Sequence, residues 1–197
     1  MAYLGEIELV FDAAAFQPGQ TNGPIDLWSL GTKGQDTKPP SVDGDFFLQL
    51  TRDYVRGLAQ AQTPPSRMLG AVRAAWDKAC TVANQTRLLN LTFPTTVTKT
   101  SDSSIAIRST ILLAPLQTKI EAVFDLRGHC NHEGVEVTVT PRAGVVYGEH
   151  FNSAKMDEFL TTRIGSRVLG RGEMKPTDSW GDVLEDLKQR LLSRGRK

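Results

Sequence analysis

Residues 119–140 read KIEAVFDLRGHCNHEGVEVTVT, and this stretch decides the class of fold. Over residues 119–126 and again over 135–140, apolar side chains occupy every second position, which is typical of strands with one buried face. The residues between them, 128–134, form a short polar connection. Because a parallel pair would need a much longer crossover, the two strands are predicted to be antiparallel neighbours.

The residues upstream extend this sheet and precede it with a helix. Residues 105–113 predict a strand that Ala114 and Pro115 end, and residues 89–97 predict another. Before them, apolar residues at helical spacing predict a helix that starts at Ser66 as its N-cap and runs to Leu88.

Downstream, residues 144–165 read GVVYGEHFNSAKMDEFLTTRIG and predict a strand, a turn and a short amphipathic helix. Asn152 or Ser153 can cap this helix, and Gly165 ends it. A second helix is predicted over residues 179–192. Residues 66–197 therefore predict a helix, four strands and two helices, which is an α+β arrangement with helices on one face of an antiparallel meander.

The N-terminal part predicts a smaller unit of similar kind. Strands are expected over residues 4–11 and 25–30, followed by a linker-like loop over 31–44 and a helix that Asp43 or Asp45 opens. Two strands make too little sheet to stand alone, so other strands complete it or upstream strands are missing. The double proline at 64–65 marks the boundary between a first, incomplete unit, residues 1–62, and a second, residues 63–197.

The composition restricts the classes of partner. The chain has 197 residues, of which 40% are hydrophobic and 23% charged, and its net charge is only +1. No global field therefore attracts nucleic acid or an anionic membrane, and neither is expected as a direct partner. Two cysteines, Cys80 and Cys130, favour a reducing compartment, and the absence of a long apolar run or a signal-peptide pattern favours the cytosol or nucleus.

No motif of catalytic or metal chemistry stands out. His129, Cys130, His132 and Glu133 form the densest set of potential metal ligands, but a structural zinc site normally draws four ligands from two chain segments and no second pair exists. We therefore interpret this stretch as a hairpin loop. Gly-x-Ser-x-Gly and Walker spacings are also missing, so we expect no catalytic, cofactor-binding or metal residues.

Three segments of the sequence resemble a known family. They are LNLTFPTTVTKTSDSSIAIRSTILL, VVYGEHFNSAKMDEFLTTRIG and WGDVLEDLKQRLLSRGRK, and with the order of elements they resemble the C-terminal region of the fungal kinetochore scaffold of the blinkin (kinetochore-null) family. The resemblance covers essentially the whole chain. It implies a tandem of RWD domains, with further strands upstream of the first one seen here.

The resemblance also implies a function in chromosome segregation at mitosis. In that family the tandem follows a coiled coil and docks the scaffold onto the Mis-twelve complex by capturing a short segment of one of its subunits. It implies a nuclear, kinetochore-bound scaffold in cell division, with no cofactor, with the Mis-twelve peptide as partner, and with a coiled-coil kinetochore protein as a further possible one.

Two capture mechanisms are open, strand addition at a sheet edge and insertion of apolar side chains into a cleft. We predict a groove around the first strand and the final strand of the second sheet, although a role in the core competes for every candidate residue. The candidate partner-binding residues are Ile7, Leu9, Phe11, Val145, Val146 and Tyr147.

Two alternatives stay open. The RWD fold is similar to that of ubiquitin-conjugating enzymes, so a catalytically inactive or regulatory domain of that kind is one; the chain has no His-Pro-Asn motif, and Cys130 with Asn131 lies at a hairpin tip. A dimerisation cap for an upstream coiled coil is the other. The cations near the C-terminus, Lys188, Arg190, Arg194, Arg196 and Lys197, favour complementing the helix dipole over binding an acidic partner.

Overall fold

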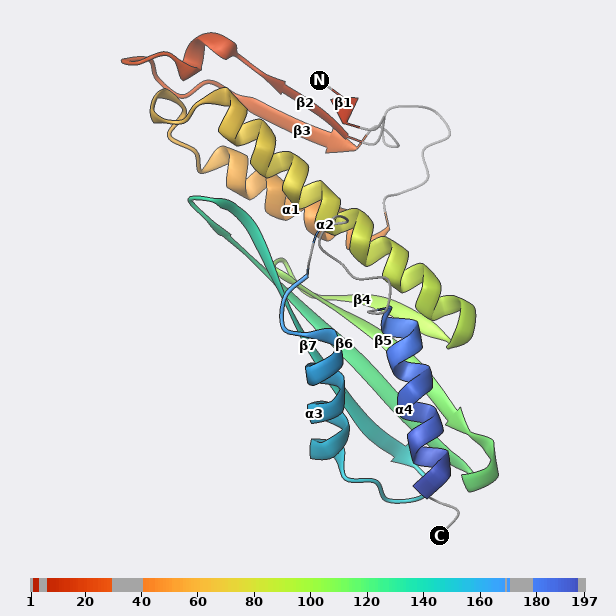
Figure 1. Ribbon diagram of the computed structural model, residues 1–197. Coiled ribbons are helices and arrows are strands. Elements are labelled where there is room, and N and C mark those ends of the chain that lie inside the picture. The colour runs from red at the N-terminus through yellow and green to blue at the C-terminus, as the bar shows by residue number, and fades with distance from the viewer. Residues whose placement is uncertain (1, 4–6, 30–40, 169, 171–178, 195–197) are drawn as a thin grey trace, which may run out of the picture.

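The described residues form two antiparallel sheets and four α-helices, so the predicted α+β class is confirmed. The computed structural model describes residues 2–3, 7–29, 41–168, 170 and 179–194 (Figure 1). The larger sheet is a meander in which each strand pairs with the next. Its strands are β4 (Thr95–Ser101), β5 (Ser104–Leu113), β6 (Thr118–Asn131) and β7 (Gly134–Tyr147).

The larger sheet has one apolar and one polar face, as the alternating pattern predicts. On β6, Ile120, Ala122, Phe124 and Leu126 are fully buried. Side chains on the opposite face interact across strands. Arg108 forms an ion pair with Glu121, Arg142 forms one with Asp125, and the His129 ring contacts the Glu136 carboxylate. The buried face therefore needs a cover of helices, while the polar face is solvated.

Helices that precede and follow the meander in the sequence cover its buried face (Figure 1). They are α2 (Pro65–Thr92), α3 (Ser153–Ile164) and α4 (Trp180–Arg194). At the start of α4, the Trp180 ring stacks on the Phe124 ring with centroids 4.8 Å apart, and its backbone N–H donates to the Gln85 side chain on α2. Trp180 therefore ties α4 both to the sheet and to α2.

The smaller sheet lies at the other end of the molecule (Figure 1). Its strands, in spatial order, are β1 (Ala2–Tyr3), β2 (Ile7–Phe11) and β3 (Ile25–Ser29), so a short strand pairs with the first strand that the sequence predicts. The next helix is α1 (Val42–Arg56). Short 3₁₀ helices are η1 (Ala13–Phe16), η3 (Gln60–Gln62) and η4 (Ala114–Leu116).

Helix α1 packs against both sheets. It contacts β3 of the smaller sheet and each strand of the larger one. Leu50 lies so close over Gly128 on β6 that a Cβ there would overlap the Leu50 side chain. The two sheets share one hydrophobic core. The division into units 1–62 and 63–197 stays a prediction, and residues 31–40 of the predicted loop lie outside the described residues.

The expected strand over residues 89–97 is wrong in its first half. Helix α2 continues to Thr92, and β4 starts only at Thr95. Leu89, Leu91 and Phe93 suggest a period of two, but Leu89 is buried one helical turn after Gln85, while Leu91 is 76% exposed. The helix ends before Pro94, as the restriction on the residue preceding a proline requires.

Two expected helix starts are also wrong in detail. Ser66 does not cap α2, because Pro65 already occupies the first helical position, where its fixed φ suits a helix and its missing N–H costs nothing. Helix α1 is not opened by Asp43 or Asp45. The hydroxyl of Ser41 caps it by accepting from the N–H of Gly44 at 3.3 Å.

The Trp180 anchor yields a stability prediction. Replacing this 5%-exposed ring, Trp180→Ala, removes its stack on Phe124 and leaves a cavity, so the free energy of unfolding should fall by about 3–5 kcal/mol in a urea titration. The exposed control Leu91→Ala should change it by less than about 0.5 kcal/mol. Equal effects of the two substitutions would contradict the anchoring role.

Candidate functional site

The predicted residues of the first strand belong to the core. Ile7 and Leu9 are 2% and 4% exposed, and both point from β2 into the hydrophobic core. Phe11 is partly buried and meets the edge of the Phe16 ring at 5.5 Å between centroids. Of this set, only Phe11 therefore offers surface to a partner.

The predicted residues at the end of β7 divide between core and surface. Val145 packs against the core, whereas Val146 and Tyr147 are each 56% exposed. The register shifts here, because Lys119 pairs with Tyr147 while Ile120 pairs with Val145. The extra residue breaks the alternation, which explains why two successive side chains are exposed.

The two predicted sets do not line one groove. β2 lies in the smaller sheet, and β7 ends at the opposite end of the molecule (Figure 1). The middle of β7's outer edge is also occupied. The N–H of Val139 donates to Ser166, the carbonyl of Val137 accepts from Val168, and the N–H of Ala143 donates to Asp157. The expected common groove of β2 and β7 is therefore wrong.

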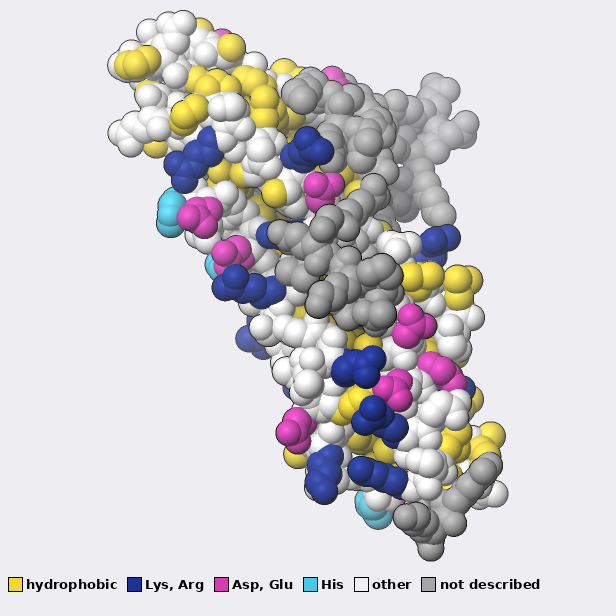
Figure 2. Space-filling model, in the orientation of Figure 1, with side chains coloured by type: hydrophobic (Ala, Val, Ile, Leu, Met, Phe, Trp, Pro, Cys, Tyr) yellow, Lys and Arg dark blue, Asp and Glu magenta, His cyan; other side chains and the backbone are white. Residues whose placement is uncertain are grey.

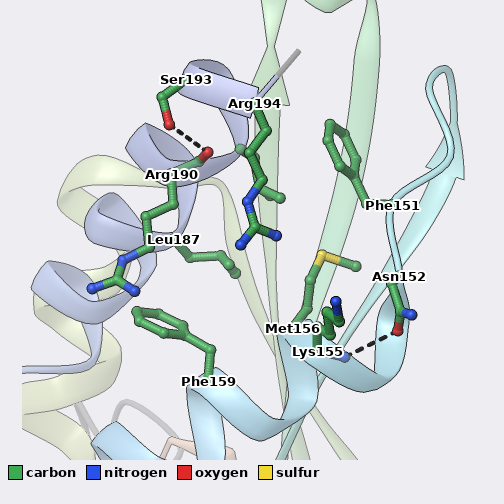
Figure 3. A pocket seen from close by; sticks show the side chains of 10 residues that line it. Phe151, Asn152, Lys155, Met156, Phe159, Leu187, Arg190, Ser193 and Arg194 are labelled. Atoms are coloured by element: carbon green, nitrogen blue, oxygen red, sulfur yellow. Dashed lines mark hydrogen bonds between the residues drawn. The ribbon is translucent and has the colours of Figure 1, made fainter. Parts of the chain in front are cut away.

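A different hollow lies between the start of α3 and the end of α4. It encloses about 270 Å³, and Figure 3 shows side chains from both helices and from the segment before α3 pointing into it. We call it the α3–α4 groove. Its lining residues are Phe151, Asn152, Lys155, Met156, Phe159, Leu187, Arg190, Leu191, Ser193 and Arg194.

The turn from β7 into α3 positions this groove. Gly148 has a φ of +104°, and a Cβ there would come within 2.5 Å of the Thr118 Cα, so the turn requires glycine. The buried hydroxyl of Thr118 accepts from the N–H of Glu149 at 2.8 Å and donates to Leu116. Of the two predicted caps, Asn152 is the one that caps α3, and it accepts from the N–H of Lys155 at 3.1 Å.

The groove has an apolar floor and aromatic sides. Met156, Leu187 and Leu191 are nearly buried and form the floor, while Phe151 and Phe159 are only partly buried and keep part of their rings accessible. The volume is slightly below the range of about 300–1,000 Å³ typical of small-molecule pockets. The groove therefore suits one or two inserted side chains better than a whole metabolite.

Charges on the rim are partly compensated. The guanidinium of Arg190 lies 4.5 Å from the Phe159 ring centroid and donates to Asp186 at 3.2 Å. Asp186 also accepts from Arg163, which joins α3 to α4. Lys155 and Arg194 make no ion pair with any described residue. Figure 2 shows Lys and Arg side chains beside hydrophobic ones over α3 and α4, with Asp and Glu side chains nearby.

The segment that carries the potential metal ligands, residues 128–134, is a tight hairpin between β6 and β7. His129 pairs with Glu136 at 3.1 Å, and the Asn131 side chain accepts from the backbone N–H groups of Glu133 and Gly134. In the described part of the chain, no three His, Cys, Asp or Glu side chains are placed to hold a metal ion.

The Cys130 thiol faces α1. Although the residue as a whole is exposed, its Sγ donates to the Leu50 carbonyl at 3.3 Å. Desolvation raises the pKa of this thiol above its ordinary value, and the nearby carboxylate of Asp53 raises it further. A nucleophilic cysteine needs the opposite shift, so this site favours a neutral thiol.

Comparison with protein-family models, with curated proteins and with solved structures found no match to this chain. No described helix combines the length and the apolar character needed to cross a membrane.

Sequence reasoning missed the α3–α4 groove, although two signals pointed toward it. Phe151 precedes the cap of α3, and Phe159 lies beside the buried stripe of that helix. From the sequence, Arg190 and Arg194 are interpreted only as cations near a helix end. The aromatic and cationic side chains come together only because α3 and α4 pack side by side in antiparallel directions. The periodicity of one helix alone does not reveal that packing. Arg196 and Lys197, from the same set, lie outside the described residues.

The raised pKa of Cys130 predicts slow alkylation. Because less thiolate is present at about pH 8, Cys130 should react with iodoacetamide more slowly than glutathione does, and its rate should still increase at pH values where an ordinary thiol is fully ionised. Peptide mass spectrometry separates Cys130 from Cys80, and the urea-unfolded chain is the control. A rate faster in the folded chain than in the unfolded chain would contradict the assignment.

Proposed function

We propose that this chain is a non-enzymatic interaction module that captures a short segment of a partner protein in the α3–α4 groove. The groove itself carries the proposal. Its apolar floor lies between two accessible aromatic rings, and cations surround it, which is the usual composition of a site that anchors a few side chains of a peptide.

The resemblance of the sequence to the blinkin family suggests which partner this is. We propose a segment of a subunit of the Mis-twelve complex, bound at the kinetochore in the nucleus, so that the chain docks an outer-kinetochore scaffold during chromosome segregation. Capture of a peptide tail needs no catalytic group, and the neutral thiol of Cys130 is compatible with a binding role.

Strand addition is the competing mechanism, and the structure limits where it can occur. The middle of β7 is covered along its outer edge. β4 is the other edge strand of the larger sheet, and no described strand pairs with its outer side. This edge has a threonine-rich sequence and exposes Lys99, a residue type that discourages pairing with a further strand. The groove therefore has the stronger support.

Aromatic substitutions in the groove test the proposed function. Phe151→Ala, alone and together with Phe159→Ala, should weaken binding of the intact Mis-twelve complex by about tenfold or more, or about 1.4 kcal/mol, since anchoring aromatic rings dominate such interfaces. Isothermal titration calorimetry measures this change. Thermal melting of each variant establishes that it is folded.

The double variant Leu112→Ala/Tyr147→Ala is the matched control for the two phenylalanine substitutions. Both side chains are more than half exposed on the polar face of the larger sheet, where each pairs with Lys119 from a neighbouring strand. The affinity of this double variant should stay within about twofold of the wild-type value, as expected for groups outside an interface. The proposal fails if the complex does not bind the wild-type chain, or if only the Leu112 and Tyr147 substitutions weaken binding.

A further inference from the structure

The α3–α4 groove also carries information about the chemistry of its occupant. We propose that the groove selects an acidic segment, which places a large apolar side chain between Phe151 and Phe159 and carboxylates beside Lys155 and Arg194. This inference rests on the proposed function, because it specifies the kind of segment that the module captures. A phosphate group on the segment would offer the same negative charge at the same two cations.

Two of the charges on the rim of the groove have no counterion among the described residues. Its lining residues include three cations and no Asp or Glu. Asp186 outside the groove compensates Arg190, whereas Lys155 and Arg194 have no ion pair with a described residue. Because the whole chain has a net charge of only +1, this concentration of positive charge is a local feature.

Helix dipoles explain only part of this arrangement. Arg194 lies in the last turn of α4, where a cation stabilises the helix end. Lys155 lies in the first turn of α3, which contains no acidic residue, and a cation gains no such stabilisation there from its own helix. Complementarity to a negatively charged occupant accounts for both positions.

A peptide fits the groove better than a nucleic acid does. Binding to nucleic acid depends on many cations that follow the phosphate backbone, and the groove offers only a few. Arg108 and Arg142, on the opposite face of the larger sheet, are paired with carboxylates and do not extend the basic surface. The apolar floor, by contrast, matches an inserted aliphatic or aromatic side chain.

The strengths of the two kinds of contact assign them different roles. Lys155 and Arg194 are both exposed, and an exposed ion pair changes an equilibrium constant by at most about fivefold. Most of the affinity must therefore come from the apolar side chain at Phe151 and Phe159. The two cations contribute selectivity and a faster, salt-sensitive association.

The experiment selects peptides from a random display library on the immobilised wild-type chain. Enriched peptides should carry a net negative charge and at least one large apolar residue. The affinity of an enriched peptide, measured by fluorescence anisotropy, should fall severalfold between about 0.05 M and about 0.5 M NaCl. Charge reversal in Lys155→Glu/Arg194→Glu should weaken it by about tenfold or more and remove the salt dependence.

A matched control keeps the overall charge change the same. Lys119→Glu/Arg127→Glu reverses two cations on β6 that point to the opposite face of the sheet, and it should change the affinity by less than about twofold. Three results would overturn the inference: no enrichment or no acidic bias among the enriched peptides, equal effects of the two double variants, or displacement of the peptide by a single-stranded oligonucleotide at low micromolar concentration.

The two proposals can fail separately. If acidic peptides bind the groove but the Mis-twelve complex does not bind the chain, the proposed function is wrong and the inference about the groove stands. If the complex binds through Phe151 and Phe159 but neither charge reversal nor salt affects its affinity, the function stands and the acidic selectivity is wrong.

Discussion

The stacking of Trp180 on Phe124 is the interaction on which the groove depends. A buried indole on a buried phenyl ring fixes the first turn of α4 on the sheet, and the hydrogen bond from its backbone N–H to Gln85 fixes the same turn against α2. Helix α4 then runs along the sheet beside α3, where Arg163 and Arg190 share Asp186 across the helix pair. The groove forms at the far end of α4, so its width follows from this anchor and from the cap and turn that start α3.

The sequence predicts the larger sheet well because its strands have one buried face. Residues 119–126 of β6 and 135–140 of β7 alternate cleanly, and local chemistry gives the helix after them a terminal glycine and a cap at Asn152 or Ser153. The junction between α2 and β4 was harder, because Leu89, Leu91 and Phe93 satisfy a strand pattern as well as a helical one. Burial decides between the two only after the sheet has formed, when Leu89 faces the core and Leu91 faces solvent.

The candidate site was less predictable than the fold, for a related reason. Ile7 and Leu9 look alike whether they cover a core or a partner, and the structure places both in the core. The exposure of Val146 and Tyr147 depends on a register shift that pairing with β6 creates, and the sequence of β7 alone does not show it. The groove residues come from two helices and a connecting segment, so only the packing of α3 on α4 brings them together.

The most direct test of the account uses two methionines as internal probes. Met156 lies on the floor of the groove, whereas Met68 on α2 is fully buried elsewhere in the core. In methyl NMR spectra of the methionine-labelled chain titrated with the Mis-twelve complex, the account predicts that the Met156 resonance shifts or broadens at saturation while the Met68 resonance keeps its position. An unchanged Met156 resonance in the saturated complex would contradict capture at the α3–α4 groove.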